Sequence, residues 1–85
     1  MKFRISDHAH QELTRRSIPL SDLETVLHEP QQVVPTFGGR EVYQSQIGDR
    51  DGQPFLLRAI VDPGSNPPLV VTVYRTSKIQ KYWRM

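Results

Sequence analysis

The sequence contains no cysteine and no long apolar run, and both absences limit what the protein can be. Without cysteine there is no disulfide, no thiolate metal ligand and no thiol nucleophile. No stretch approaches the roughly 20 apolar residues that a membrane span requires, and the first residues lack the apolar core of a secretion signal. We therefore expect a cytoplasmic protein that does not enter the membrane, and the sequence indicates no metal site and no cofactor.

Acidic residues are missing from the end of the chain, so positive charge is concentrated there. The net charge of the 85 residues is only +2, but after Asp62 there is no acid and four cations follow: Arg75, Lys78, Lys81 and Arg84. Tyr74, Tyr82 and Trp83 lie among these cations. Cations interleaved with flat rings are typical of surfaces that bind single-stranded nucleic acid. The alternative interpretation is a sheet edge followed by a solvated basic tail.

The length and the hydrophobic pattern predict a single α+β domain over residues 1–85. A helix is predicted at 8–16 after an N-cap at Ser6 or Asp7. A second helix is predicted to begin at a capping box whose first residue is Ser21 and to end before Pro30. Four strands follow, at 32–36, 41–47, 55–62 and 69–74.

Short connections join most of these strands, including glycine-containing turns at 37–40 and 48–52. Short connections favour antiparallel neighbours. The predicted fold is therefore two N-terminal helices on one face of an antiparallel sheet of about four strands, with Pro35 marking an edge strand and the second face partly open. The last strand, 69–74, is predicted to be the most buried.

Two polar residues interrupt the apolar strands. Arg58 lies between Leu57 and Ala59 and alternates with the core positions, so we expect it on the open face. A cation in such a place either pairs with an acid or binds an anionic ligand. Thr72 is expected on the same face, although a β-branched threonine is common in any strand.

The first helix carries the groups that could transfer protons. His8 and His10 point about 200° apart on a helix, so they are not expected to share a metal. A helix histidine is either a surface or capping residue, or a general base or acid that works near neutrality. Arg16 lies about 80° around the axis from His8, so one face can present an imidazole and a guanidinium together. The alternative for Arg16 is a cation that complements the helix dipole.

Several segments of the chain together resemble a family of short, uncharacterised bacterial proteins with the pattern HA…RxI…LxxP…GR…VTVY. These segments are 5–9, 15–18, 26–30, 39–40, 57–62 and 71–74. That family has been grouped with the RelE- and BrnT-like toxins, within the wider set of barnase-, EndoU- and colicin-like ribonucleases. The resemblance covers nearly the whole chain.

The resemblance implies a RelE-like fold whose curved sheet meets RNA with its open face. It also implies metal-independent RNA cleavage by 2′-hydroxyl attack, in the toxin of a bacterial toxin–antitoxin pair that a partner antitoxin protein neutralises. The family pattern carries over to five residues of this sequence: His8, Arg16, Arg58, Thr72 and Tyr74. In these terms His8 is the general base or acid, and Arg58 with Arg16 binds the scissile phosphate. Thr72 contacts the phosphate or the 2′-hydroxyl, and Tyr82 is a further acid or a stacking group.

Other classes of function stay open alongside the ribonuclease. The expected RNA-binding surface consists of Tyr74, Arg75, Lys78, Lys81 and Trp83, and it would serve a non-catalytic RNA-binding or protein-interaction module equally well. A structural partner whose strand edge accepts a segment of another chain is a third option. A homodimer also stays open, since a small exposed sheet often dimerises.

Overall fold

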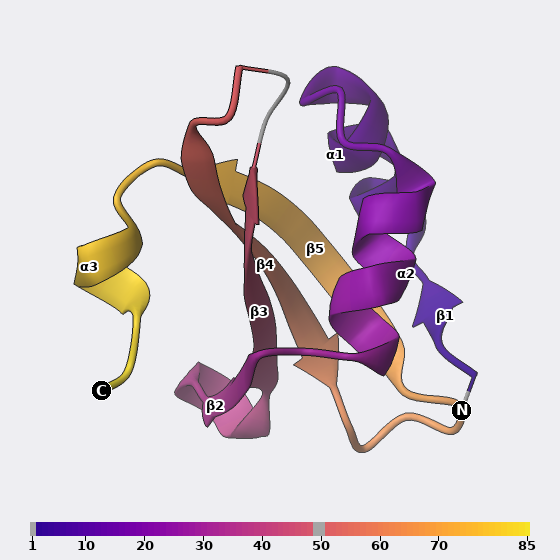
Figure 1. Cartoon of the computed structure of the whole chain (residues 1–85). Coiled ribbons are helices and arrows are strands. Elements are labelled where there is room, and N and C mark those ends of the chain that lie inside the picture. The colour runs from indigo at the N-terminus through magenta and orange to yellow at the C-terminus, as the bar shows by residue number, and fades with distance from the viewer. Residues whose placement is uncertain (1, 49–50) are drawn as a thin grey trace.

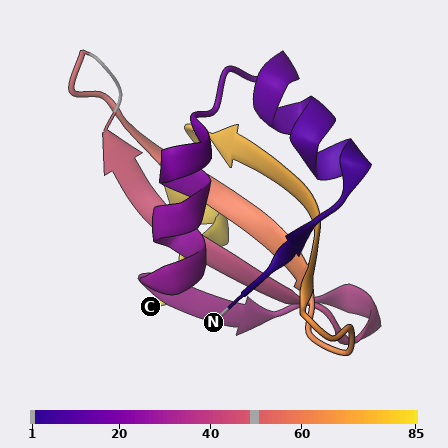
Figure 2. The ribbon, with the colours of Figure 1, turned by 90° about the vertical axis from the view of Figure 1, so that its right-hand side faces the viewer.

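The computed structural model describes residues 2–48 and 51–85. Its elements are β1 (Arg4–Ile5), α1 (Asp7–Arg15), α2 (Leu20–His28), β2 (Gln32–Pro35), η1 (Phe37–Gly39), β3 (Glu41–Gly48), β4 (Pro54–Asp62), β5 (Leu69–Thr76) and α3 (Ile79–Tyr82). Figure 1 shows α1 and α2 on one side of the sheet and α3 on the other, and Figure 2 shows α1 and α2 in front of the strands. The predicted α+β class is therefore confirmed. Within the described ranges no helix is long and apolar enough to cross a membrane.

The sheet has five strands in the order β1-β5-β4-β3-β2. β1 runs parallel to β5, whereas the other neighbours are antiparallel. The prediction of an antiparallel sheet of about four strands holds for β2 to β5 but missed β1, which adds a fifth strand and a parallel pair. β1 consists of two residues, which pair with Leu69 and Val70 near the other end of the chain. Two residues are too few to show the alternation that reveals a strand in a sequence.

The four predicted strands correspond to β2, β3, β4 and β5. β2 is an edge strand, as Pro35 predicted, because it pairs only with β3. The predicted turn at 37–40 is present, with φ values of 75° at Gly38 and 77° at Gly39 that favour glycine. The predicted turn at 48–52 includes two residues outside the described ranges. β4, rather than the last strand, contains the longer set of buried residues.

The two main helices begin in different ways. Ser6 is the N-cap of α1, as predicted, and its hydroxyl accepts a hydrogen bond of 3.0 Å from the backbone N–H of Ala9. α2 begins directly after Pro19, and no side chain caps it. The carbonyl of Pro19 already accepts the N–H of Asp22 at 3.0 Å, so the helix has started before Ser21. The predicted capping box at Ser21 was therefore wrong.

The hydrophobic core lies between the sheet and the two main helices. α1 packs along β5, and α2 packs over β4 and β3. Leu23 and Val26 of α2 are fully buried and meet Leu57 and Ala59 of β4 in one cluster. Since this core fixes α1 against β5, it also fixes where the helix presents its polar residues.

The second face of the sheet is more covered than the sequence predicted. α3 lies against this face (Figure 1). We call residues 77–85, which include α3, the C-terminal segment. Gln44 and Leu56 alternate with the core positions and so belong to this second face, yet both are fully buried. The second face, which was predicted to be partly open, is therefore closed at Gln44 and Leu56.

Candidate functional site

A row of polar side chains crosses four strands on the second face of the sheet. Tyr74 of β5 lies opposite Arg58 of β4, Arg58 lies opposite Gln44 of β3, and Gln44 lies opposite Gln32 of β2. We call these four residues the polar row. Residues that face each other in this way are close enough for their side chains to interact.

Hydrogen bonds connect the polar row from end to end. The guanidinium of Arg58 donates one bond through Nη1 to the Tyr74 hydroxyl and another through Nε to Gln44 Oε1, the latter at 2.8 Å. Gln44 Nε2 in turn donates to Gln32 Oε1 at 2.8 Å. Each amide orients the next, so Arg58 is held in one position.

The polar row also fastens the C-terminal segment to the sheet. Gln44 Nε2 donates to the backbone carbonyl of Tyr82 at 3.2 Å. Gln32 accepts the backbone N–H of Arg84 at 3.1 Å and donates to its carbonyl. The ring of Tyr82 is thereby held with its centroid 4.2 Å from the guanidinium carbon of Arg58, in the range of a cation–π contact.

Arg58 has no acidic partner among the residues that the structure describes. Across residues 2–48 and 51–85 it forms no ion pair; its hydrogen bonds go to a neutral amide and a neutral hydroxyl. Of the five N–H donors that an arginine has, these two bonds use two and leave three. Of the two alternatives that the sequence left open for Arg58, the geometry favours an anionic ligand over an internal acid.

His8 and Thr72 form a second polar pair beside the polar row. His8 is exposed on the first turn of α1, and its Nε2 lies 3.1 Å from the hydroxyl oxygen of Thr72 on β5. Thr72 and Tyr74 are two residues apart on one strand, which places them on one face and about 7 Å apart. Thr72, which His8 contacts, therefore lies on the same face of the sheet as Tyr74 and Arg58.

A bulge in β5 sets the position of His8. Ile60 pairs with Thr72 while Val61 pairs with Val70, so Val71 is the extra residue on β5. The carbonyl of Val71 accepts a hydrogen bond of 2.8 Å from the hydroxyl of Ser6, the N-cap of α1. β-Bulges are frequent next to functional sites because they redirect a side chain or end the pairing. Here the bulge anchors α1 where His8 reaches Thr72.

Arg16 lies on the same helix stripe as His8 but is bound to an acid. Its Nε donates to Glu12 Oε1 at 3.0 Å, and Arg15 holds the same carboxylate through two hydrogen bonds of 2.9 and 3.1 Å. These bonds from Arg15 and Arg16 lower the pKa of Glu12 from its ordinary 4.5 to about 2. Arg16 thus belongs to an ion cluster on α1 and, as the structure stands, has no contact with the polar row.

The low pKa of Glu12 predicts a pH-dependent contribution to stability. The folded state favours the charged carboxylate, so its contribution is complete above pH 4.5 and is lost as the pH falls from 4.5 toward 2. We expect Glu12→Gln to lower stability at pH 7, and the difference from the unsubstituted protein to shrink across this window. Urea unfolding at pH 7, 4 and 2.5 measures it. A difference that stays constant with pH would contradict the assignment.

The predicted RNA-binding residues are divided between the two faces. Tyr74 lies in the polar row, whereas its neighbour Arg75 points to the helix side, with its guanidinium carbon 5.4 Å from the Phe55 ring centroid. Lys78 and Lys81 are exposed on the C-terminal segment, and Lys81 Nζ lies 5.3 Å from the Tyr82 ring centroid. The structure therefore brings together the predicted cations of the C-terminal segment but separates Arg75 from them.

The residues that the sequence reading missed are neutral ones. Gln44 and Gln32 position Arg58 and the C-terminal segment, and Ser6 positions α1, yet none of them was predicted as part of a site. The sequence does not single out the two glutamines as site residues, since Gln44 is followed by Ser45 and Gln46 and so is not an isolated polar residue in an apolar strand. In the part of the chain that the structure describes, no group of three histidine, aspartate or glutamate side chains could hold a metal ion.

These features define a small α+β domain with a cationic polar row on the face opposite its main helices and a histidine of α1 that contacts Thr72 of β5. The chain belongs to a protein family described as a domain of unknown function, DUF4258, which it matches over residues 5–75. Thus α1, α2 and nearly all of the sheet lie within the match, and the C-terminal segment follows it. No curated protein and no solved structure matches the chain.

Proposed function

We propose that this protein is a metal-independent endoribonuclease with a RelE-like fold, and that it acts as the toxin of a bacterial toxin–antitoxin pair. One observation carries the proposal. Arg58 is fixed by Gln44 and Tyr74, has three N–H donors left and forms no ion pair with an acid in residues 2–48 and 51–85. A guanidinium in this state suits a phosphate, because its planar fork matches two phosphate oxygens.

The neighbouring groups supply what RNA cleavage requires. His8 is exposed and takes the proton of the 2′-hydroxyl, whose oxygen then attacks the adjacent phosphorus. Arg58 stabilises the negative charge that develops on the phosphorane. The P–O bond to the 5′-oxygen breaks, and the Tyr82 hydroxyl gives that oxygen a proton. The products of this sequence are a 2′,3′-cyclic phosphate and a free 5′-hydroxyl.

Thr72 has a supporting role in this scheme. Its hydroxyl lies 3.1 Å from His8 Nε2 in the free protein, so it holds the imidazole toward the second face until substrate arrives. In the complex the same hydroxyl is free to contact the 2′-hydroxyl or a phosphate oxygen. Arg16 is bound to Glu12 of its own helix and has no part in this scheme.

The toxin assignment and the antitoxin partner are supported by the resemblance of the sequence to RelE- and BrnT-like toxins. The order of two N-terminal helices followed by an antiparallel meander is compatible with it, although β1 adds a short parallel strand. The antitoxin would be a protein that covers the second face and excludes RNA.

A second candidate function is RNA binding without cleavage. The arrangement around Arg58 favours it, because the ring of Tyr82 already occupies one side of the guanidinium. The exposed cations Lys78, Lys81 and Arg84 lie on the C-terminal segment. In this case the basic segment supplies the affinity and His8 has no role.

Incubation of the purified protein with a mixed single-stranded RNA in excess EDTA tests the proposal against this second candidate. The ribonuclease proposal predicts discrete fragments at every salt concentration that permits binding. The second candidate predicts intact RNA and a bound fraction that decreases steeply with salt. Intact RNA with no binding would contradict both.

A further inference from the structure

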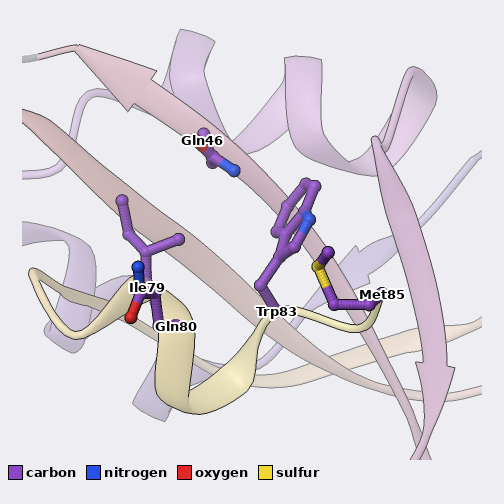
Figure 3. Close-up of a pocket in the computed structure, with 5 residues that line it drawn as sticks. All are labelled: Gln46, Ile79, Gln80, Trp83 and Met85. Carbon is purple, nitrogen blue, oxygen red and sulfur yellow. The ribbon is translucent and has the colours of Figure 1, made fainter.

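A hollow lies beside the polar row, between β3 and the C-terminal segment. Its volume is about 560 Å³, within the range of about 300–1,000 Å³ that small-molecule sites have. We call it the α3 hollow, and it is lined by Gln46, Ile79, Gln80, Trp83 and Met85. Figure 3 shows Ile79 and Trp83 rising from the C-terminal segment toward β3, from which Gln46 faces them.

The α3 hollow is one step along the sheet from Arg58. Gln46 is two residues after Gln44 on β3 and therefore lies on the same face, about 7 Å away. Gln46 pairs with Leu56, which is itself two residues before Arg58 on β4. An RNA strand whose phosphate is bound at Arg58 therefore has its next nucleotide within reach of the α3 hollow.

The lining combines a flat ring with amide groups. Trp83 offers an indole face and Ile79 an apolar wall, so a flat aromatic ligand can stack there. The side-chain amides of Gln46 and Gln80 form no hydrogen bond with residues in the described ranges. Each amide has donors and an acceptor at one end, which is the pattern that base edges pair with.

The surroundings of the α3 hollow favour an anionic chain over an apolar peptide. A neighbouring hollow of about 500 Å³ shares Ile79 and Gln80 with it and adds Lys78 and Lys81. The C-terminal segment carries these cations and no acid. A hollow that can hold a nucleobase, beside a hollow lined by lysines that can hold a phosphate, matches a nucleotide, because the base and the phosphate of a nucleotide are covalently joined.

We propose that the α3 hollow binds one nucleobase of single-stranded RNA, stacked on Trp83, with Gln46 and Gln80 contacting its edge. Lys78 and Lys81 hold the phosphate of the same nucleotide. The proposal rests on the proposed function for RNA as the ligand, and it adds a specificity site that selects which base lies next to the phosphate at Arg58.

The fluorescence of Trp83 tests this proposal directly, because the chain contains one tryptophan. The probe is a short 2′-O-methyl RNA, which cannot be cleaved by 2′-hydroxyl attack, and a set of copies with one abasic position each. The proposal predicts that the intact probe quenches Trp83, and that one abasic position removes the quenching and weakens binding roughly fivefold or more. Equal quenching by all abasic copies, or binding without quenching, would overturn it.

A pair of matched variants tests the amide contact. Gln46→Leu keeps the tryptophan and is expected to weaken the intact probe several-fold and to reduce the preference among probes with different bases at the critical position. Gln11→Leu makes the same change on the exposed side of α1 and is expected to bind like the unsubstituted protein. Identical binding and base preference by both variants would remove the assigned role of Gln46.

Cleavage of unmodified RNA, assayed in parallel, separates this proposal from the proposed function. Cleavage without base-dependent quenching would overturn the nucleobase site and leave the ribonuclease intact. Base-dependent quenching without cleavage would retain the nucleobase site and overturn the catalysis. Neither quenching nor cleavage would overturn both.

Discussion

Replacement of Arg58 by glutamine is expected to lower the rate of RNA cleavage by roughly 10²–10³-fold, the loss typical when one group that stabilises transition-state charge is removed. The guanidinium forms no ion pair in the part of the chain that the structure describes, so its positive charge is available to the phosphorane. Glutamine retains hydrogen-bonding capacity toward Gln44 but carries no charge. Arg58→Lys retains the charge but not the planar fork, so its cleavage rate is expected to lie between those of Arg58→Gln and the unsubstituted protein.

Two controls separate a catalytic role of Arg58 from a structural one. Arg4→Gln makes the same change at an exposed position on β1 and should leave cleavage unchanged. Urea unfolding of Arg58→Gln should show a loss of only about 1–2 kcal/mol, because Tyr74 loses its hydrogen bond whereas the new amide can still donate to Gln44. If the variant is largely unfolded under assay conditions, or if Arg58→Gln retains full activity, the assignment is contradicted.

Replacement of His8 by alanine is expected to lower cleavage by roughly 10²–10⁴-fold while the protein still binds RNA. The imidazole is exposed and its one contact in the described structure is with Thr72, so its removal costs the fold little. Single-turnover cleavage and binding of a non-cleavable RNA should be measured on the same preparation. Loss of binding in proportion to cleavage would argue against a proton-transfer role.

The same helix supplies the matched control for His8. His10 is exposed and lies two residues further along α1, about 200° around the axis. His10→Ala should therefore cleave at the rate of the unsubstituted protein. If both variants lose activity equally, the effect comes from α1 as a whole and His8 is not the base.

The local parts of the fold could be read from the sequence because they depend on neighbouring residues. Ser6 predicted the start of α1 because it is a favourable N-cap residue. The alternation of apolar and polar residues around Arg58 predicted which face of the sheet Arg58 occupies. β1 was not predicted, because it has only two residues and pairs with a parallel strand near the other end of the chain. The α2 cap was misread because Pro19, with its fixed φ, starts the helix before Ser21.

The site was predictable in part, for a similar reason. The alternation that places Tyr74 with Arg58 also sends Arg75 to the other face. The ion pair of Arg16 with Glu12 was not predicted, although the two residues have the four-residue spacing that permits it. Gln44 could not be recognised. Its burial depends on the C-terminal segment, which reaches β3 only in the folded chain.

The chemical nature of the RNA ends tests the central claim most directly. RNA cleaved by the protein in EDTA should be mapped by mass spectrometry, beside an otherwise identical RNA with 2′-deoxyribose at each cleaved position. The account predicts 2′,3′-cyclic phosphate and 5′-hydroxyl ends, and no cleavage at the deoxy positions. Ends with 3′-hydroxyl and 5′-phosphate, or cleavage at the deoxy positions, would contradict it.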